Sequence, residues 1–205
     1  MMKEKLKEIV IDTELQKLVN KFNVPGGWTK SDECITKFKD IIKPLLKNNQ
    51  NDCCAYCGLP LGTRNPEIDH IAPKGGEKRP KHYEVTFSPL NLVYACHYCN
   101  STECKGQKDV VESKPSEEYS KWKFKLVHPY LDDPKDYFEI NDNETIIYLP
   151  KKDSDLLHRQ KAEYTIEMFN LNSEAHLMEK AKQILFERNP EHCRKIVLEI
   201  STYMP

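Results

Sequence analysis

The chain has 205 residues, of which 39% are hydrophobic and 31% charged, and its formal net charge is −1. This length predicts one or two small domains. No apolar run approaches the roughly 18 residues that a membrane-spanning helix needs, and the charged N-terminus lacks the apolar core of a signal peptide, so we expect a cytoplasmic protein with no membrane contact. Because the net charge gives no overall attraction to nucleic acid, such contacts would have to come from local basic patches.

Two helices are predicted in the N-terminal part of the chain. Apolar residues recur at near-helical spacing through residues 3–22, and the pattern stops at Val24-Pro25-Gly26-Gly27. A second helix is predicted to begin with Ser31 as its N-cap and to kink or end at Pro44. Both patterns are typical of helices that pack against a core.

The C-terminal part begins with a polar stretch, residues 113–121, which we interpret as a connector. Residues 137–140 and 145–149 then have the composition of short strands. They flank Asn141-Asp142-Asn143-Glu144, a sequence typical of turns, and together they predict a hairpin.

Helical patterns return at residues 154–169 and 173–188, and a last apolar run covers residues 196–200. The middle of the chain differs from both ends because cysteine, glycine and proline are frequent there and apolar runs are short. We therefore divide the chain into three segments: an N-terminal helical segment (1–50), a central domain (51–112), and a C-terminal segment with a hairpin and helices (113–205).

Two C-x-x-C pairs, Cys54-Ala-Tyr-Cys57 and Cys96-His-Tyr-Cys99, predict a tetrahedral structural zinc site. Two intervening residues let one tight turn direct both sulfurs at one ion, and the second pair completes the tetrahedron. A site of four thiolates has no open coordination position, so this zinc would stabilise the fold without taking part in chemistry. The alternative is buried cysteines with accidental spacing.

Two further cysteines lie beside the predicted ligands. Cys53 could replace Cys54 in a C-x-x-x-C arrangement, and Cys104 is close enough to compete with Cys99. Without a secretory signal, unpaired cysteines are expected to be reduced thiols. We assign all the remaining cysteines as non-ligands: Cys34, Cys53, Cys104 and Cys193.

A second set of motifs lies around these pairs. Glu67-Ile-Asp69-His70-Ile-Ala-Pro73-Lys74 follows the first pair, Asn91-Leu-Val precedes the second, and Asn100 directly follows Cys99. Together with Lys105-Gly106, these motifs resemble the HNH endonuclease family. The resemblance covers residues 51–108, about a quarter of the chain.

The resemblance implies an α+β fold in which a central ββα-metal unit, braced by the zinc site, is flanked by N- and C-terminal helices. It implies that His70 is the general base and that Asn91 orients it. Asp69 and Asn100 would bind the catalytic Mg²⁺ or Mn²⁺, in an H-N-N version of the motif, because many relatives have histidine at the last position. Lys105 lies further from Asn100 than this pattern leads us to expect.

The chemistry of phosphodiester hydrolysis calls for the same residue types. Histidine, with an unperturbed pKa of about 6.5, can deprotonate water near neutral pH. Mg²⁺ prefers a few protein oxygens while it keeps several waters, and Asp69 and Asn100 can supply such oxygens. Because neighbouring residues on a strand point to opposite faces, the pair Asp69-His70 predicts a bulge or a strand end.

Basic side chains gather around these motifs and could line a groove for the phosphates of a DNA substrate without selecting a sequence. A solvated surface is the alternative interpretation. Lys74 and Lys105 are the candidates for phosphate binding. The basic residues of this region are Arg64, Lys74, Lys78, Arg79, Lys81, Lys105 and Lys108.

Residues 128–138 are similar to a segment of the HNH proteins of Septu-type antiphage systems, where the nuclease works beside an ATPase. This similarity implies an effector of bacterial defence with an ATPase partner bound to its terminal helices. Two alternatives stay open. One is a noncatalytic zinc-ribbon module that binds nucleic acid or protein, and the other is a homing or restriction enzyme, for which no recognition helix is visible.

Overall fold

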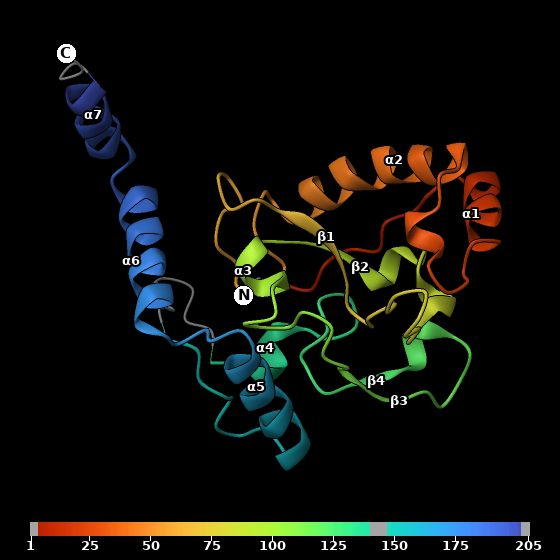
Figure 1. The fold of residues 1–205 in the computed structure, drawn as a ribbon. Helices are drawn as coiled ribbons and strands as arrows, with labels where there is room; N and C mark the ends of the chain where they lie inside the picture. Colours follow the sequence, from red (N-terminus) through yellow and green to blue (C-terminus); the bar gives the residue numbers. More distant parts are fainter. Residues whose placement is uncertain (1–3, 140–146, 202–205) are drawn as a thin grey trace.

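A computed structural model describes residues 4–139 and 147–201. Figure 1 shows two N-terminal helices on one side of a central pair of strands, and a small second sheet with two further helices on the other. The last two helices run outward from this body and end in the C-terminus. Within the described residues every helix is too short or too polar to span a bilayer.

The first helix, α1, is Thr13–Asn20, so the helix predicted over residues 3–22 forms only in its second half. Residues 5–12 run as extended chain without regular secondary structure, and Leu6, Ile9 and Ile11 are buried there without a helix, whereas Val10 is exposed. The amide of Leu6 donates to the carbonyl of Pro129 at 2.9 Å, which ties the extended segment to the C-terminal part. Asp12 then caps α1 by accepting from the amide of Leu15.

The second helix, α2, is Glu33–Asn49, and it differs from the prediction at two points. Its N-cap is Asp32 instead of Ser31, because the Asp32 carboxylate accepts from the amide of Cys34 at 2.9 Å. The helix also continues through Pro44, which is exposed. Burial of one face outweighs the roughly 3 kcal/mol cost of an internal proline; that face consists of Ile35, Phe38, Ile42 and Leu46.

Strands β1 (Glu67–His70) and β2 (Leu92–Ala95) pair antiparallel, and helix α3 (His97–Asn100) follows β2. This arrangement confirms the predicted α+β class with a central strand–strand–helix unit. His70 is the last residue of β1, opposite Leu92, as the expectation of a strand end requires. The buried Gln50 at the end of α2 pairs with β2 in both directions, since its side chain accepts from the Tyr94 amide and donates to the Tyr94 carbonyl.

A second sheet consists of β3 (Val111–Ser113) and β4 (Lys123–Phe124). The stretch predicted as a polar connector runs between them, but it contains a 3-10 turn, η4 (Tyr119–Lys121). Tyr119 in this turn is buried, so the connector contributes to the core. An aromatic side chain within a polar stretch was the signal that the sequence interpretation passed over.

The remaining helices agree closely with the sequence pattern. Helices α5 (Leu156–Met168) and α6 (Glu174–Arg188) fall within the two predicted ranges, and α7 (Pro190–Ser201) contains the last apolar run. No strand forms in the described part of the predicted hairpin; the amide of Glu139 donates to the carbonyl of Leu149 at 2.9 Å, beside an isolated bridge between Phe138 and Pro150. Tyr137 belongs to a short helix, α4 (Pro134–Tyr137). The predicted turn at residues 141–144 lies outside the described residues.

A buried chain of polar groups joins the C-terminal part to the central unit. The amides of Tyr130 and Leu131 both donate to Nδ1 of His128, so the proton of the neutral imidazole lies on Nε2. Nε2 is 3.0 Å from the Tyr119 hydroxyl, which donates in turn to Oδ1 of Asn91 at 2.8 Å. Each member has its partner, as buried polar groups require.

The buried His128 in this set of polar groups predicts that the stability of the protein depends on pH. Burial, followed by the charges of Lys161 and Lys5, holds the pKa of His128 well below its usual range. In the unfolded chain His128 titrates near about 6.5, so between the two pKa values the unfolded state binds a proton that the folded state does not. The contribution of His128 to stability is complete above the unfolded-state pKa. It is lost as the pH falls from there toward the folded-state pKa, by up to about 1.4 kcal/mol per pH unit.

We therefore expect the free energy of unfolding, measured with urea, to decrease from pH 7.5 to pH 5.5. His128→Asn keeps an acceptor near the Nδ1 position and should make this decrease smaller. It should not abolish it, because burial lowers the pKa of His70 in the same direction. His97→Asn, a change at an exposed histidine, is the control and should leave the slope unchanged. If the free energy of unfolding changed equally with pH in wild type and His128→Asn, the assignment of this pH dependence to His128 would be wrong.

Candidate metal centre and active site

The sulfurs of Cys54, Cys57, Cys96 and Cys99 all lie within 4.8 Å of one another, and all four residues are buried. The Sγ atoms of Cys57 and Cys96 are 4.0 Å apart. A tetrahedral zinc site with Zn–S bonds of about 2.3 Å separates its sulfurs by about 3.8 Å, so the cluster fits zinc. The structure thus brings together the four predicted ligands, and neither Cys53 nor Cys104 belongs to the group found among the described residues.

Local backbone geometry directs the two sulfurs of the first cysteine pair toward the cluster. The amide of Gly58 donates to the carbonyl of Cys54 at 2.8 Å and closes the turn. Gly58 has a φ of 69°, which a residue without a Cβ adopts without strain. The second pair begins at the end of β2 and continues into α3. The amide of Ala55, within the first pair, donates to the carbonyl of Tyr94 in β2 at 3.2 Å and so fixes the two pairs relative to each other.

Helix α6 lies against the first cysteine pair, a contact that the sequence interpretation missed. Hydrogen bonds from Cys54 and the other cluster thiols, with a further contribution from His176 of α6, lower the pKa of Cys57. Glu179, about one turn further along α6, forms an ion pair with Arg64 at 2.8 Å. A histidine in a helical stripe carries no sequence signal for such a contact, because its partner comes from a segment more than a hundred residues away.

His70 is buried, with 5% of its surface exposed. Its Nε2 lies 3.1 Å from the carbonyl oxygen of Thr86, which can only accept, so Nε2 carries the proton. Nδ1 is left as the basic nitrogen, and it has no hydrogen-bond partner among the described residues. Burial, together with the charges of Lys74 and Lys105, holds the imidazole pKa well below its usual range. The neutral, proton-accepting form therefore dominates at neutral pH.

Trp28 fixes the plane of this imidazole. Its ring meets the ring of His70 edge to face, with centroids 4.6 Å apart at 88°. Trp28 lies in the 3-10 turn η1 (Gly27–Thr29), where the backbone passes close to the end of α1. A Cβ on Gly27 would lie 1.9 Å from the carbonyl oxygen of Phe22, so only glycine allows this approach. The sequence predicted that a helix ends near this turn, but it did not predict that the turn contacts the site.

Asp69 is buried between two donors. The Tyr56 hydroxyl donates to Oδ2 at 2.5 Å, and Nζ of Lys105 lies 3.0 Å from Oδ2 and 3.2 Å from Oδ1. The same ammonium donates to the carbonyl of His70 at 2.7 Å. Lys105 is fully buried, so in this structure it orders the two motif residues and does not face solvent, in contrast to the phosphate-binding position expected for it.

Asn91, at the end of the 3-10 turn η3 (Pro89–Asn91), has no hydrogen bond to His70 in the described part of the chain. Its Oδ1 accepts from the amide of Ala72 at 2.7 Å, and its Nδ2 donates to the carbonyls of Ala72 and Val85. Val85 directly precedes Thr86, whose carbonyl accepts from His70. The Asn91 side chain therefore supports the backbone on both sides of the imidazole. Orientation of the base by Asn91 would therefore be indirect, through the backbone.

Asn100 ends α3 at the rim of the site. Its Nδ2 donates to the Glu67 carboxylate at 2.7 Å, which leaves the side-chain carbonyl oxygen without a hydrogen-bond partner among the described residues. Asp69, His70, Lys74 and Asn100 line one pocket of about 110 Å³. The structure thus gathers the predicted base, both predicted metal ligands and one predicted phosphate-binding lysine around the same space.

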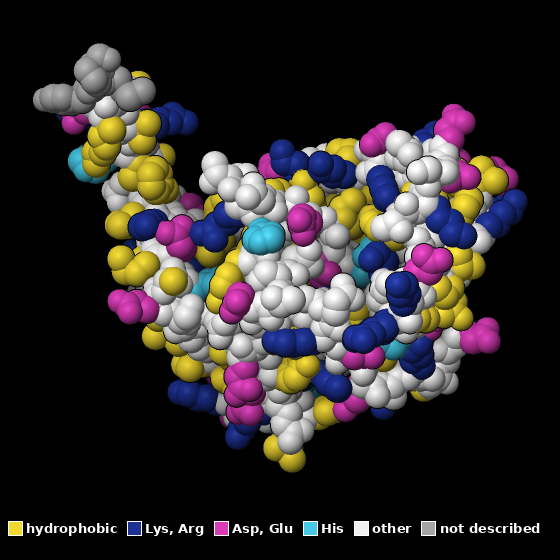
Figure 2. All heavy atoms as spheres, in the orientation of Figure 1, with side chains coloured by type: hydrophobic (Ala, Val, Ile, Leu, Met, Phe, Trp, Pro, Cys, Tyr) yellow, Lys and Arg dark blue, Asp and Glu magenta, His cyan; other side chains and the backbone are white. Residues whose placement is uncertain are grey.

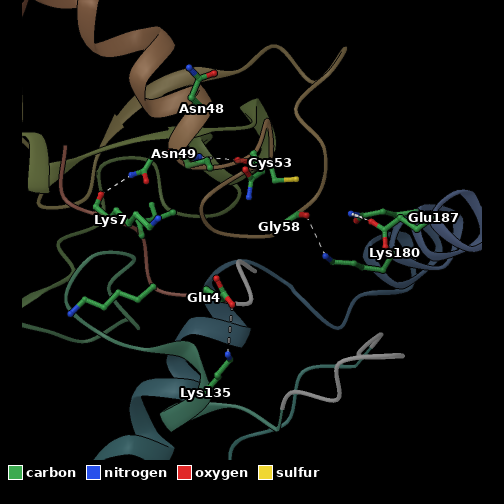
Figure 3. A pocket seen from close by; sticks show the side chains of 14 residues that line it. Glu4, Lys7, Asn48, Asn49, Cys53, Gly58, Lys135, Lys180 and Glu187 are labelled. Carbon is green, nitrogen blue, oxygen red and sulfur yellow. Dashed lines mark hydrogen bonds and ion pairs between the residues drawn. The ribbon is translucent and has the colours of Figure 1, made fainter. Parts of the chain in front are cut away.

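A larger cavity of about 750 Å³ lies elsewhere, between the N-terminal segment, the end of α2 and α6 (Figure 3). Its charged groups are of both signs, as in the pair of Glu4 and Lys135 at 3.8 Å. Polar side chains at its wall bond to nearby backbone, as Asn49 does to the carbonyl of Lys7. None of the predicted site residues lines it, so size alone does not identify the functional site.

The surface shown in Figure 2 carries Lys and Arg side chains interspersed with Asp and Glu. Several of the basic residues singled out in the sequence have local partners, since Lys81 donates to the carbonyl of Gln107 and Arg64 pairs with α6. The distribution agrees with the near-zero net charge. It favours contacts with a few phosphates over a continuous basic groove.

We expect Cys96→Ser to abolish zinc binding and to unfold the central unit. Zinc binding to such sites contributes about 10–16 kcal/mol in small domains, more than most proteins have as net stability. Zinc content by mass spectrometry under native conditions and the melting temperature would measure both effects. Cys193→Ser, at a cysteine outside the cluster, is the matched control and should retain zinc. Zinc-free wild-type protein, or a Cys96→Ser variant as stable as wild type, would refute the assignment.

No protein-family model matches the chain. The CRISPR-associated endonuclease Cas9 of Corynebacterium diphtheriae is 33% identical to it over 88 residues. The matched region is 43% of this chain and 7% of that Cas9, so less than half of the chain matches a small part of a much longer protein. Together with the four-cysteine cluster, this partial similarity to an endonuclease agrees with a zinc-braced nuclease unit.

Proposed function

We propose that the chain is a metal-dependent HNH endonuclease that hydrolyses phosphodiester bonds in DNA. The observation that carries the proposal is the shared pocket of His70, Asp69 and Asn100 beside the four-cysteine cluster. The partial similarity to a protein named an endonuclease supports the same reaction class.

In this proposal Nδ1 of His70 accepts the proton of the attacking water. The hydrogen bond from Nε2 to the Thr86 carbonyl and the contact with Trp28 hold the ring, so no reorientation is needed before proton transfer. Lys74, which also lines the pocket, would contact a phosphate oxygen of the substrate. Its charge also contributes to the lowered pKa of the base.

Asp69 and Asn100 would hold Mg²⁺ or Mn²⁺ through oxygen atoms. A carboxylate has about four acceptor sites, and three are used by the contacts with Tyr56 and Lys105. One lone pair of Oδ1 therefore remains, together with the side-chain oxygen of Asn100. When bound, such an ion stabilises negative charge on the phosphorane and on the departing 3′ oxygen.

A noncatalytic zinc-ribbon module that binds nucleic acid or protein is the alternative, and one observation favours it. Lys105 already neutralises Asp69 within the protein, which reduces the attraction of this carboxylate for a second cation. In that case Asp69 and Lys105 would form a structural ion pair. The two functions differ in one measurable property, namely whether the protein nicks DNA when a divalent cation is supplied.

We further propose that the chain acts as the effector of a bacterial defence system with an ATPase partner. Helix α7 runs outward at the end of the chain and has no buried residue among those described (Figure 1). It exposes Ile196, Val197, Leu198 and Ile200, an apolar set typical of a protein contact. The interspersed surface charges supply little attraction to DNA, so a partner that delivers substrate would be useful.

The catalytic proposal predicts that His70→Ala lowers plasmid nicking in Mg²⁺ or Mn²⁺ by about 10²- to 10⁴-fold, because a general base contributes a factor of this size. Zinc content should not change, since His70 lies outside the cluster. His97→Ala is the matched control: this histidine is exposed in α3, beside the second cysteine pair, and its loss should leave the rate near wild type.

His70→Gln provides a second variant of similar size, and the melting temperature of each variant separates loss of chemistry from loss of fold. Nicking by His70→Ala at the wild-type rate would refute the assignment of the base. Wild-type protein that binds DNA with full zinc content but cuts none, in either cation, would favour the noncatalytic module.

The partner proposal predicts that the chain purified from its native cells carries an ATPase, and that the purified chain alone has weak activity at physiological salt. Removing the apolar face with Ile196→Glu and Ile200→Glu should release the partner, while Lys195→Glu on the charged side of α7 should retain it. Size-exclusion chromatography of the mixture measures both. Strong nicking without a partner, and no ATPase recovered, would refute this part and leave the nuclease proposal intact.

A further inference from the structure

We propose that Tyr56 is a positioning residue that sets the direction of the Asp69 carboxylate for cation binding. The inference rests on the proposed function, because it assumes that Asp69 binds a divalent cation. It adds a residue that the motif comparison did not single out, and it makes the zinc site part of the geometry of the second metal site.

Tyr56 is held on three sides. It lies between Cys54 and Cys57 in the first cysteine pair, and the adjacent amide of Ala55 donates to the carbonyl of Tyr94 in β2 at 3.2 Å. Its ring is 2% exposed and stacks on Phe169 at the end of α5, with centroids 4.3 Å apart and planes at 13°. The hydroxyl therefore has little freedom to move relative to β2.

This fixed hydroxyl donates to Oδ2 of Asp69 at 2.5 Å. Lys105 contacts both oxygens of the same carboxylate, so on its own it would not select one rotation of the group. Tyr56 breaks this symmetry by binding one oxygen only. Oδ1 is thus left as the oxygen with a lone pair available, and Asp69 and Asn100 line the same pocket.

The second cysteine pair contains a tyrosine at the same place, and it lacks these contacts. Tyr98 precedes Cys99 as Tyr56 precedes Cys57, but its side chain is 41% exposed. Its hydroxyl accepts from Nδ2 of Asn170 at 3.0 Å, and the described residues show no hydrogen bond from it to Asp69. Position within a C-x-x-C pair therefore does not create the function. Burial against Phe169 and the distance to Asp69 do.

The test compares Tyr56→Phe with Tyr98→Phe in the full chain. Tyr56→Phe keeps the ring and its stacking and removes one hydrogen-bond donor. Loss of a group that orients a metal ligand typically weakens metal binding about 10- to 100-fold. We expect the Mn²⁺ concentration for half-maximal nicking to rise at least about tenfold, with the rate at saturating Mn²⁺ within about threefold of wild type. Tyr98→Phe should behave as wild type.

Direct Mn²⁺ binding without DNA, followed by electron paramagnetic resonance, should show the same weakening. Zinc content and melting temperature check that Tyr56→Phe is folded. Phe169→Leu removes the stacking partner and keeps the hydroxyl, so it should shift Mn²⁺ binding in the same direction by a smaller factor. This variant decides the matter if Tyr56→Phe proves unstable.

Unchanged or tighter Mn²⁺ binding by folded Tyr56→Phe, with wild type and Asp69→Asn clearly different, would overturn the inference alone. Wild-type protein that binds no Mn²⁺, or binds it as well as Asp69→Asn does, would overturn the proposed metal site and this inference with it. An equal shift in Tyr98→Phe would also overturn it, because a general effect on the cysteine pairs would then explain the result.

Discussion

The convergence of four cysteine sulfurs is the constraint on which the rest of the structure depends. The first pair follows α2 and the second follows β2, so their meeting closes a loop of about forty residues around the pocket. The central sheet has only two strands of four residues each, too little to be stable alone. A bound zinc ion would supply the missing cohesion, because its binding free energy becomes folding free energy.

Buried polar contacts connect this brace to the pocket. Asp69 is joined to the first cysteine pair by Tyr56 and to the segment after the second pair by Lys105. On the other side, His128 and Tyr119 from the C-terminal part support Asn91, which braces the backbone around His70. The C-terminal segment is thus part of the site's framework and not only a neighbour of it. A half-satisfied network of this kind would be costly, and the observed one is closed.

The electrostatics of the pocket separate the two proposed roles. Burial and nearby lysines keep the imidazole of His70 neutral, as a proton acceptor requires, while Asp69 keeps a charged partner in Lys105. A buried ammonium beside Asp69, the proposed metal ligand, is compatible with two functions. The pair is either a site that binds a cation only together with substrate phosphates, or a structural ion pair. The partial similarity to one Cas9 supports a nuclease.

The sequence by itself determined the features that depend on local spacing. Paired cysteines, the order of the Asp-His and Asn motifs and the two helices α5 and α6 follow from patterns within short windows, since turn geometry and helical periodicity are local properties. The α+β class followed from the resemblance that these motifs carry. Tertiary structure alone decided where extended chain replaced helix before α1, because burial of Leu6 against the C-terminal part needs no helical turn. It also decided the partners of Asp69, His70 and Asn91, since Tyr56, Trp28, Lys105 and Tyr119 reach them from distant segments. Contacts between residues far apart in sequence leave no periodicity to detect.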